Sequence, residues 1–207
     1  MKLQGLYGIT DTELLANGRL LPYVESALKG GMQVLQYRDK TKDTSRRYKE
    51  AKALKQLCSQ YNAQLIINDD VLLAKELNVG LHLGQEDGSI AKARQLLGNN
   101  TIIGATCHGS IELAKRAKEE GANYLAFGRF FPSKTKPNAK PADIKILDEA
   151  KSLELPICAI GGITLNNVHI LTQHSVNLIA VVNELFDTDD IIQVEKKAKQ
   201  FINTFLL

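Results

Sequence analysis

The stretch that decides the fold class is Met32-Gln33-Val34-Leu35-Gln36-Tyr37-Arg38-Asp39-Lys40. Its first four residues form a largely apolar run of the kind that makes a buried strand. Alternate side chains of an extended chain share one face. One face therefore carries an amide and two cations, which are Gln36, Arg38 and Lys40. Such a row, at the point where a strand passes into a loop, could read a heterocycle edge and hold a polyphosphate, although solvated charges at a strand end are the simpler alternative.

The same unit, a short apolar strand followed by a polar loop and a helix, recurs along the chain. Strands are predicted over residues 6–9, 32–37, 64–67, 80–83, 101–105, 124–127, 156–160 and 176–182. Helices are predicted over residues 22–29, 43–61, 71–77, 90–97, 111–120, 142–152, 164–173 and 190–205. The seventh helix is expected to have Thr164 as its cap. Short continuous apolar strands are buried on both faces, and their alternation with helices indicates a parallel sheet with right-handed crossovers.

Eight such units close into a barrel, so we expect an α/β protein with the (β/α)8 TIM-barrel fold. A doubly wound open sheet is the main alternative. It usually carries a glycine-rich turn after the first strand, whereas that turn here is Thr10-Asp11-Thr12 and no GxGxxG is present. We expect residues 1–207 to form a single catalytic domain.

The composition limits the partners. The 207 residues are 44% hydrophobic and 24% charged, with a net charge of +3, as in a soluble globular protein. Basic residues are interspersed with acidic ones and no apolar run approaches transmembrane length, so we expect neither nucleic acid nor a membrane as a partner. Three widely spaced cysteines without a CxxC motif, and a start without the apolar core of a signal peptide, predict a cytoplasmic protein.

Polar residues gather at the predicted C-terminal strand ends, which form one rim in a barrel and hold its active site. Asp69 and Asp87 follow neighbouring strands, and two carboxylates there suit one Mg²⁺, a hard ion that keeps several waters and bridges to substrate phosphates. Glu86 is a possible substitute ligand. Asp70 is expected to cap the following helix instead.

Two loops suit phosphate. Residues 133–136 lie on the long loop after the sixth predicted strand, where hydroxyls, backbone amides and a cation could cradle an anion. A solvated turn is the alternative there. Gly161-Gly162 follows the seventh strand, and barrels often bind phosphate at the seventh and eighth loops, where glycines allow close backbone approach. A tight turn would explain one glycine better than two.

Two other features are expected to be structural. Cys107-His108 could act as nucleophile and base, but no orienting Asn or Asp is evident, which favours a buried thiol and a loop histidine. His82 lies within a predicted strand and is expected in the core or at the rim.

Together these features resemble the thiamine phosphate synthase family almost end to end. The resemblance begins at Tyr7-Gly8-Ile9-Thr10-Asp11 and continues through Gln36-Tyr37-Arg38-Asp39-Lys40, Ile67-Asn68-Asp69-Asp70, His82-Leu83-Gly84-Gln85-Glu86-Asp87, Pro132-Ser133-Lys134-Thr135-Lys136 and Ile160-Gly161-Gly162-Ile163. It implies a (β/α)8 transferase of thiamine biosynthesis that requires Mg²⁺. This enzyme joins 4-amino-5-hydroxymethyl-2-methylpyrimidine diphosphate to 4-methyl-5-(2-phosphooxyethyl)thiazole and releases diphosphate. These two small molecules would be its partners, and a homo-oligomer is compatible with the pattern.

The resemblance also implies residue roles. The pyrimidine diphosphate would be held by Gln36, Tyr37, Arg38, Asp39, Lys40, Asn68, Thr106 and Lys136, among which Arg38, Lys40 and Lys136 would be catalytic. Mg²⁺ would be held by Asp69 and Asp87. The thiazole phosphate would be held by Ser133, Lys134, Thr135, Gly162, Val182 and Asn183.

The chain departs from the family pattern at several positions. Thr106 stands where serine is frequent and Ser133 where threonine is usual, and both keep the hydroxyl. Asn183 stands where serine is expected, and His174-Ser175 replaces Gly-Ala. These last changes concern the thiazole-phosphate pocket.

Two rival functions are a thiazole tautomerase on the same barrel, with a general acid/base such as His108, and a non-catalytic phosphate-ligand binding protein.

Overall fold

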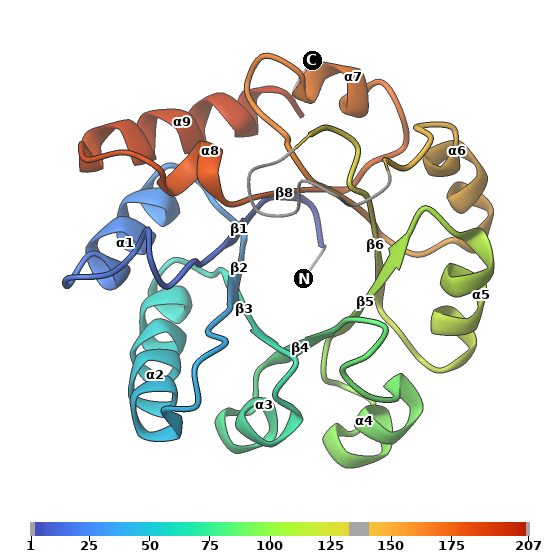
Figure 1. Cartoon of the computed structure of the whole chain (residues 1–207), viewed down its shortest axis with the longest axis horizontal. Helices are drawn as coiled ribbons and strands as arrows, with labels where there is room; N and C mark the ends of the chain where they lie inside the picture. The colour runs from blue at the N-terminus through green and yellow to red at the C-terminus, as the bar shows by residue number, and fades with distance from the viewer. Residues whose placement is uncertain (1–2, 133–140, 206–207) are drawn as a thin grey trace.

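A computed structural model describes residues 3–132 and 141–205. Eight parallel strands close into a barrel in the order of the sequence, from β1 to β8, and the last strand pairs with the first. Helices surround the ring of strands on the outside (Figure 1). The predicted (β/α)8 barrel is therefore confirmed, and the open doubly wound sheet is excluded.

The strands are four to six residues long. They are β1 Gly5–Ile9, β2 Val34–Tyr37, β3 Gln64–Asn68, β4 Gly80–Leu83, β5 Ile103–His108, β6 Tyr124–Phe127, β7 Ile157–Ile160 and β8 Leu178–Val181. The helices are α1 Leu20–Lys29, α2 Thr44–Gln60, α3 Val71–Leu77, α4 Ile90–Leu97, α5 Ile111–Glu119, α6 Ile146–Ala150, α7 Val168–Thr172, α8 Asn183–Phe186 and α9 Ile191–Asn203. A short 3₁₀ helix, η1 Lys151–Leu153, continues α6.

The helices differ from prediction in the last third of the chain. The prediction that Thr164 caps the seventh helix is wrong, because α7 begins only at Val168. The side chain of Asn167 accepts a hydrogen bond from the Thr164 backbone N–H at 2.8 Å, so the residues between them form a turn. The helix predicted over residues 142–152 shrinks to α6 and η1, and the four-residue helix α8 was not predicted.

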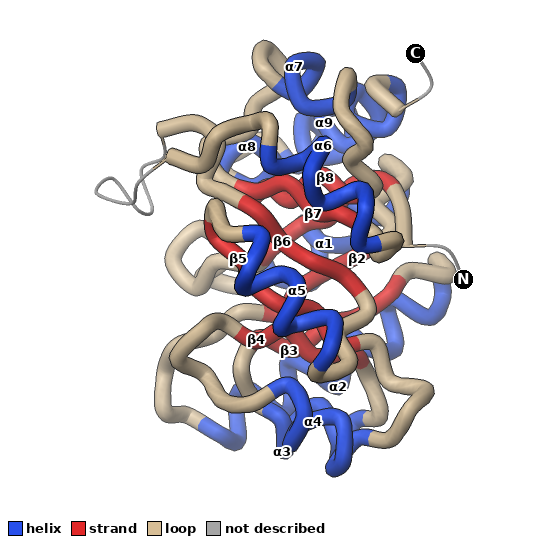
Figure 2. Tube along the Cα trace, turned by 90° about the vertical axis from the view of Figure 1, so that its right-hand side faces the viewer, coloured by secondary structure: helices blue, strands red, loops and turns tan. Residues whose placement is uncertain are grey.

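Alternation along the strands divides the apolar residues between two cores. Inward-facing side chains such as Tyr7, Val34 and Ile66 fill the barrel. Outward-facing ones such as Leu6 and Leu35 pack under the helices. Figure 2 shows the tilted strands enclosed by this helical layer. The double burial explains why the strands read as continuous apolar runs.

Inward-facing polar residues lie near the C-terminal ends of four neighbouring strands. They are Gln36 of β2, Asn68 of β3, His82 of β4 and Thr106 of β5. Side chains two residues apart on a strand share a face, so residues two positions earlier, such as Val34 and Ile66, lie deeper in the barrel. The barrel therefore ends in a polar layer at its active-site end.

Candidate active site

The end of β2 divides its side chains as alternation predicts. Gln36 is buried in the barrel, where its amide Nε2 donates to the Tyr7 hydroxyl at 2.8 Å. Tyr37 points outward and donates from its hydroxyl to Glu50 of α2 at 2.7 Å. Burial, followed by the Glu50 carboxylate, raises the pKa of Tyr37, which therefore stays neutral. Tyr37 thus contacts α2 and does not face the barrel mouth.

Asp39 is also directed outward and organises the loop that follows β2. Its carboxylate accepts the Thr41 backbone N–H at 2.7 Å and Nη2 of Arg46 at 2.5 Å. Burial by itself would raise the pKa of Asp39, but these hydrogen bonds and the Arg46 charge outweigh it and leave the pKa below its usual value. Asp39 therefore fixes the loop that carries the cations.

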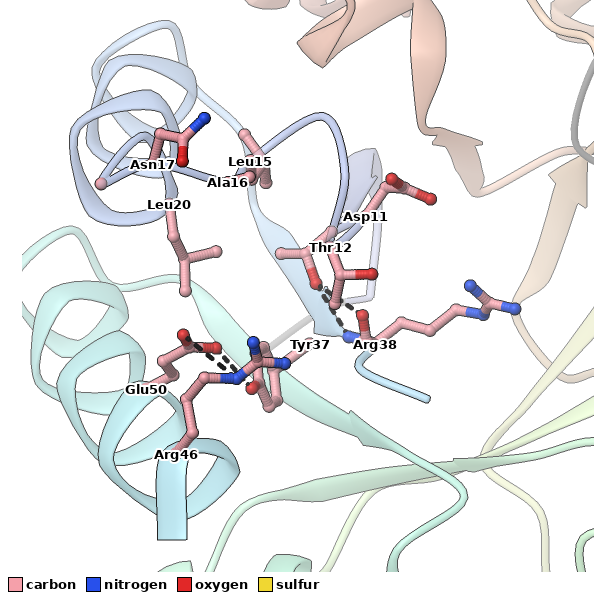
Figure 3. A pocket seen from close by; sticks show the side chains of 12 residues that line it. Asp11, Thr12, Leu15, Ala16, Asn17, Leu20, Tyr37, Arg38, Arg46 and Glu50 are labelled. Atoms are coloured by element: carbon pink, nitrogen blue, oxygen red, sulfur yellow. Dashed lines mark hydrogen bonds and ion pairs between the residues drawn. The ribbon is translucent and has the colours of Figure 1, made fainter. Parts of the chain in front are cut away.

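Arg38 is held by its backbone. The buried hydroxyl of Thr10, at the end of β1, accepts the Arg38 N–H at 2.8 Å, and the Thr10 N–H donates to the Gln36 carbonyl at 2.9 Å. Within residues 3–132 and 141–205, the Arg38 guanidinium makes no hydrogen bond or ion pair. In Figure 3 its side chain extends away from Arg46 and Glu50. A rim arginine with a fixed backbone and an uncommitted guanidinium is suited to binding an anion.

Lys40 joins the two aspartates predicted to bind metal. Its ammonium contacts the Asp69 carboxylate and lies 4.0 Å from Oδ1 of Asp87. Asp69 has a left-handed backbone, with φ of 65°, and its carboxylate also accepts the Asn68 amide at 2.5 Å. Burial, and then the neighbouring Asp69 carboxylate, raises the pKa of Asp87. The two predicted ligands therefore share one small site with a cation already beside them.

The residues present fit Mg²⁺. Two carboxylates provide the hard oxygen ligands that this ion prefers, and both lie beside the same Lys40 ammonium. No group of three or more His, Cys, Asp or Glu residues that could hold a metal occurs in the described part of the chain. Such a site leaves coordination positions for water and substrate oxygens, which is how Mg²⁺ usually binds beside phosphates. Glu86, the possible substitute ligand, is exposed.

The remaining rim residues of β5 lie beside His82. The Thr106 hydroxyl is 2.9 Å from Nε2 of His82, and the Gln85 side chain donates to the Thr106 carbonyl. Cys107 is fully buried, and burial raises the pKa of its thiol to about 12. His108 is exposed at the strand end. The expected buried thiol is confirmed, whereas His108 is the last residue of β5 and not a loop residue. A buried thiol with a raised pKa disfavours a Cys–His nucleophile.

Asp70 takes the structural role that was expected. Its carboxylate accepts the Leu73 N–H at 2.9 Å, as the N-cap of α3, and also binds Nη2 of Arg47 at 2.7 Å. A capping aspartate satisfies a helix N–H that otherwise lacks a partner. Asp69 and Asp70 are therefore adjacent in sequence but separate in role.

The loop after β7 packs against the loop after β6. Gly161 and Gly162 both have positive φ, 103° and 64°. A Cβ at Gly161 would overlap Arg129, and one at Gly162 would overlap the Pro132 carbonyl oxygen. Close backbone packing thus accounts for both glycines. Val182 precedes α8 and Asn183 begins it, whereas Ser133, Lys134, Thr135 and Lys136 fall outside the described residues.

A pocket of about 340 Å³ lies beside the mouth, between the loop after β1 and helix α2 (Figure 3). Arg38 and Tyr37 line it, but Asp69, Asp87 and Thr106 do not. Tyr37 and Glu50, which line it, are hydrogen-bonded to each other. Because neither aspartate lines it, this pocket is separate from the aspartate pair.

Two functional candidates were not predicted from the sequence, namely the buried tyrosines Tyr7 and Tyr124. Their hydroxyls are 2.8 Å apart, and Tyr124 is also 2.8 Å from Nδ1 of His82. The available signal was a tyrosine at an inward position of two apolar strands. It could not be used without knowing that β1 and β6, 117 residues apart at these positions, face each other across the barrel.

Comparison with known proteins identifies relatives. Residues 6–185 match the family model of thiamine monophosphate synthase. A thiamine phosphate pyrophosphorylase from Pyrococcus furiosus is 31% identical, with a TM-score of 0.87 over 98% of this chain and 96% of that one.

More distant proteins share the fold alone. The thiamine phosphate pyrophosphorylase from Bacteroides thetaiotaomicron is 17% identical, with a TM-score of 0.69 over 97% of this chain and 96% of that one. Mycobacterium tuberculosis tryptophan synthase is 9% identical, with a TM-score of 0.73 over 99% and 93% of the two chains. In the part of this chain that the structure describes, no helix has the length and apolar character needed to span a membrane.

Proposed function

The chain belongs to the thiamine monophosphate synthase family, and from that premise we propose how its rim residues carry out the reaction. The enzyme is a transferase of thiamine biosynthesis. It joins 4-amino-5-hydroxymethyl-2-methylpyrimidine diphosphate to 4-methyl-5-(2-phosphooxyethyl)thiazole, and the products are thiamine phosphate and diphosphate.

The pyrimidine diphosphate spans the rim from the β2 loop to β5. Gln36, Asn68 and Thr106 meet the ring, while Arg38, Lys40 and Lys136 meet the diphosphate. The free guanidinium of Arg38 and the exposed ammonium of Lys40 support this assignment. Tyr37 and Asp39 contribute by fixing the loop through α2, which their contacts with Glu50 and Arg46 support.

Asp69 and Asp87 are the proposed Mg²⁺ ligands, on the strength of their shared site and oxygen donors. When bound, Mg²⁺ would neutralise charge on the diphosphate as it leaves. Lys40, which contacts Asp69 and lies near Asp87, would contact the diphosphate with its ammonium if the two carboxylates held the cation. In this proposal, positive charge lies where negative charge accumulates in the transition state.

The reaction needs little acid–base chemistry. The bond between the pyrimidine methylene carbon and the diphosphate oxygen breaks, and the electron-rich aminopyrimidine carries the resulting positive charge. The thiazole nitrogen then donates its lone pair to that carbon, so no strong base is required. The protein holds the two substrates in line and stabilises the departing anion through Arg38, Lys40 and Lys136.

The thiazole phosphate is assigned to the opposite side of the mouth, where Gly162 follows β7 and Val182 and Asn183 follow β8. Ser133, Lys134 and Thr135 would complete this site from the loop after β6. The close packing of Gly162 against Pro132 supports a joint role for the two loops.

Single-domain architecture over residues 1–207, the cytoplasmic location and the possible homo-oligomer remain part of this proposal.

The observation that carries these roles is the approach of one lysine to two carboxylates from neighbouring strands. The test is product formation from both substrates with excess Mg²⁺, with EDTA, and after Mg²⁺ is restored. We expect thiamine phosphate only when Mg²⁺ is available. Asp69→Asn and Asp87→Asn should raise the Mg²⁺ needed for half-maximal rate at least about tenfold, whereas Glu76→Gln, at an exposed position on α3, should not.

The same assay separates the rival functions. A thiazole tautomerase would ignore the diphosphate substrate, and a binding protein would form no product. An EDTA-insensitive synthase would contradict the metal assignment while leaving the reaction intact.

A further inference from the structure

A continuous chain of hydrogen bonds, buried except at its partly buried Thr106 end, crosses the barrel beneath the proposed pyrimidine site. Successive atoms are 2.8, 2.8, 2.8 and 2.9 Å apart. Its members come from five strands and are, in order, Gln36, Tyr7, Tyr124, His82 and Thr106. We call this set the floor relay. It connects the two residues proposed to meet opposite edges of the ring.

The relay has a direction. The Gln36 amide nitrogen donates to the Tyr7 hydroxyl. Among the described residues, Tyr124 is the acceptor in reach of the Tyr7 hydroxyl hydrogen, and the reverse order would leave that buried hydrogen without a partner, so Tyr7 donates to Tyr124. Tyr124 in turn donates its single hydrogen to Nδ1 of His82. A neutral imidazole that accepts at Nδ1 carries its hydrogen on Nε2, which donates to the Thr106 hydroxyl oxygen.

The environment of His82 is consistent with that neutral form. The ring is buried, and this burial lowers the pKa of His82 to about 4. The ring stacks on Tyr124 with centroids 5.6 Å apart, and Tyr124 meets Tyr7 edge-on at 6.0 Å. Gly104 provides the space, because a Cβ there would overlap the Tyr124 ring. The three rings are therefore locked in orientation as well as hydrogen-bonded.

The direction determines what the two ends offer a ligand. Gln36 uses its nitrogen within the relay, which leaves its carbonyl oxygen as an acceptor. Thr106 accepts from His82 with its oxygen, which leaves its hydroxyl hydrogen to donate. An aminopyrimidine has the complementary pair, an amino N–H donor and ring nitrogens that accept. An oxo analogue presents an acceptor in place of the amino donor.

We propose that Tyr7, Tyr124 and His82 are positioning residues that fix this donor–acceptor polarity, so that the mouth selects an amino-substituted pyrimidine over its oxo analogue. The proposal rests on the assignment of Gln36 and Thr106 to the pyrimidine substrate. Specificity arises here because the wrong ring leaves a buried polar group without a partner.

The first test is the tautomer of His82 in the full-length enzyme. Histidine labelled with ¹⁵N gives signals from four residues, and loss of one set in His82→Gln assigns His82. We expect the hydrogen on Nε2 throughout the neutral pH range. A hydrogen on Nδ1 would reverse the relay and overturn the proposal.

The second test is discrimination between the amino substrate and its oxo analogue, measured as the ratio of kcat/KM. Tyr124→Phe removes the hydroxyl that donates to His82, and Tyr7→Phe removes the link to Gln36. Each should lower the ratio about tenfold and raise KM for the pyrimidine diphosphate, with KM for the thiazole phosphate unchanged. Tyr61→Phe is the matched control, because Tyr61 loses a hydrogen bond to Glu25 on the outside of the barrel.

The outcomes separate the relay from the function. A wild-type enzyme that makes no thiamine phosphate would overturn the function itself. Product formation with an unchanged discrimination ratio in both tyrosine variants would overturn only the relay. That result includes an equal loss of kcat/KM for the amino substrate and for its oxo analogue. If either variant fails to fold, the wild-type His82 tautomer still decides the direction.

Discussion

Thr10→Val tests whether the backbone of Arg38 is held for anion binding. Valine keeps the shape of threonine but removes the buried oxygen that accepts the Arg38 N–H at 2.8 Å. An N–H left without its partner costs about 1–3 kcal/mol. For a chain of this length, each kcal/mol lowers Tm by about 2–4 °C.

Thr10→Ser is the matched control. It keeps the hydroxyl and loses one buried methyl group, worth about 0.8 kcal/mol. Denaturant unfolding should therefore show a smaller loss of stability for the serine variant. KM for the pyrimidine diphosphate should also distinguish the two variants, because only Thr10→Val removes the hydrogen bond that holds the Arg38 backbone in place.

Steady-state kinetics report the loss of Arg38 positioning as a rise in KM for the pyrimidine diphosphate. A charged hydrogen bond is worth about 1.5–3 kcal/mol, so Thr10→Val should raise KM for the pyrimidine diphosphate by up to about 100-fold. In an Arg38→Ala background the same change should add no further increase, because the residue it positions is gone. Additive effects of Thr10→Val and Arg38→Ala on KM would refute the reasoning.

Three further predictions concern the barrel interior and the loop after β6. Gly104→Ala should lower the free energy of unfolding by about 1–3 kcal/mol, because the added methyl overlaps Tyr124; unchanged denaturant stability would contradict this. Burial lowers the pKa of His82 from 6.5 to about 4, so the folded enzyme binds fewer protons than the unfolded chain between those pH values. The free energy of unfolding should therefore rise with pH through that window, by up to about 3 kcal/mol, and this gain should be lost as pH falls towards 4. His82→Gln should flatten the measured dependence of unfolding free energy on pH, whereas His169→Gln, at an exposed position, should not. Lys136→Ala should reduce kcat more than it raises KM for the thiazole phosphate, and an unchanged kcat would count against its proposed role.

The strands were predictable because burial on both faces leaves a plain apolar signal. β4 and β6 have the predicted limits, and the others differ by one to three residues at one or both ends. The cap at Asp70 was predictable for a similar reason, since the signal is local. The predicted helix start at Thr164 was wrong because threonine and asparagine both cap helices, so the sequence does not choose between them. Only the folded turn shows that the Asn167 side chain accepts the Thr164 N–H.

The site was predictable as a set of strand ends and not as a set of contacts. Its convergence follows from barrel topology, so Lys40, Asp69 and Asp87 could be expected together. The floor relay could not, because it depends on which inward side chains meet across the barrel. The Tyr7–Tyr124 contact has no local signature, and the glycine that makes room for it lies on a third strand.

The most direct measurement is a crystal structure of the enzyme with Mn²⁺, in place of Mg²⁺, and diphosphate, with the metal located by anomalous scattering. We expect the ion between the Asp69 and Asp87 carboxylates, with the diphosphate bound to it and in contact with Arg38 and Lys40. An ion and a diphosphate bound elsewhere, with Lys40 still against Asp69, would contradict the account.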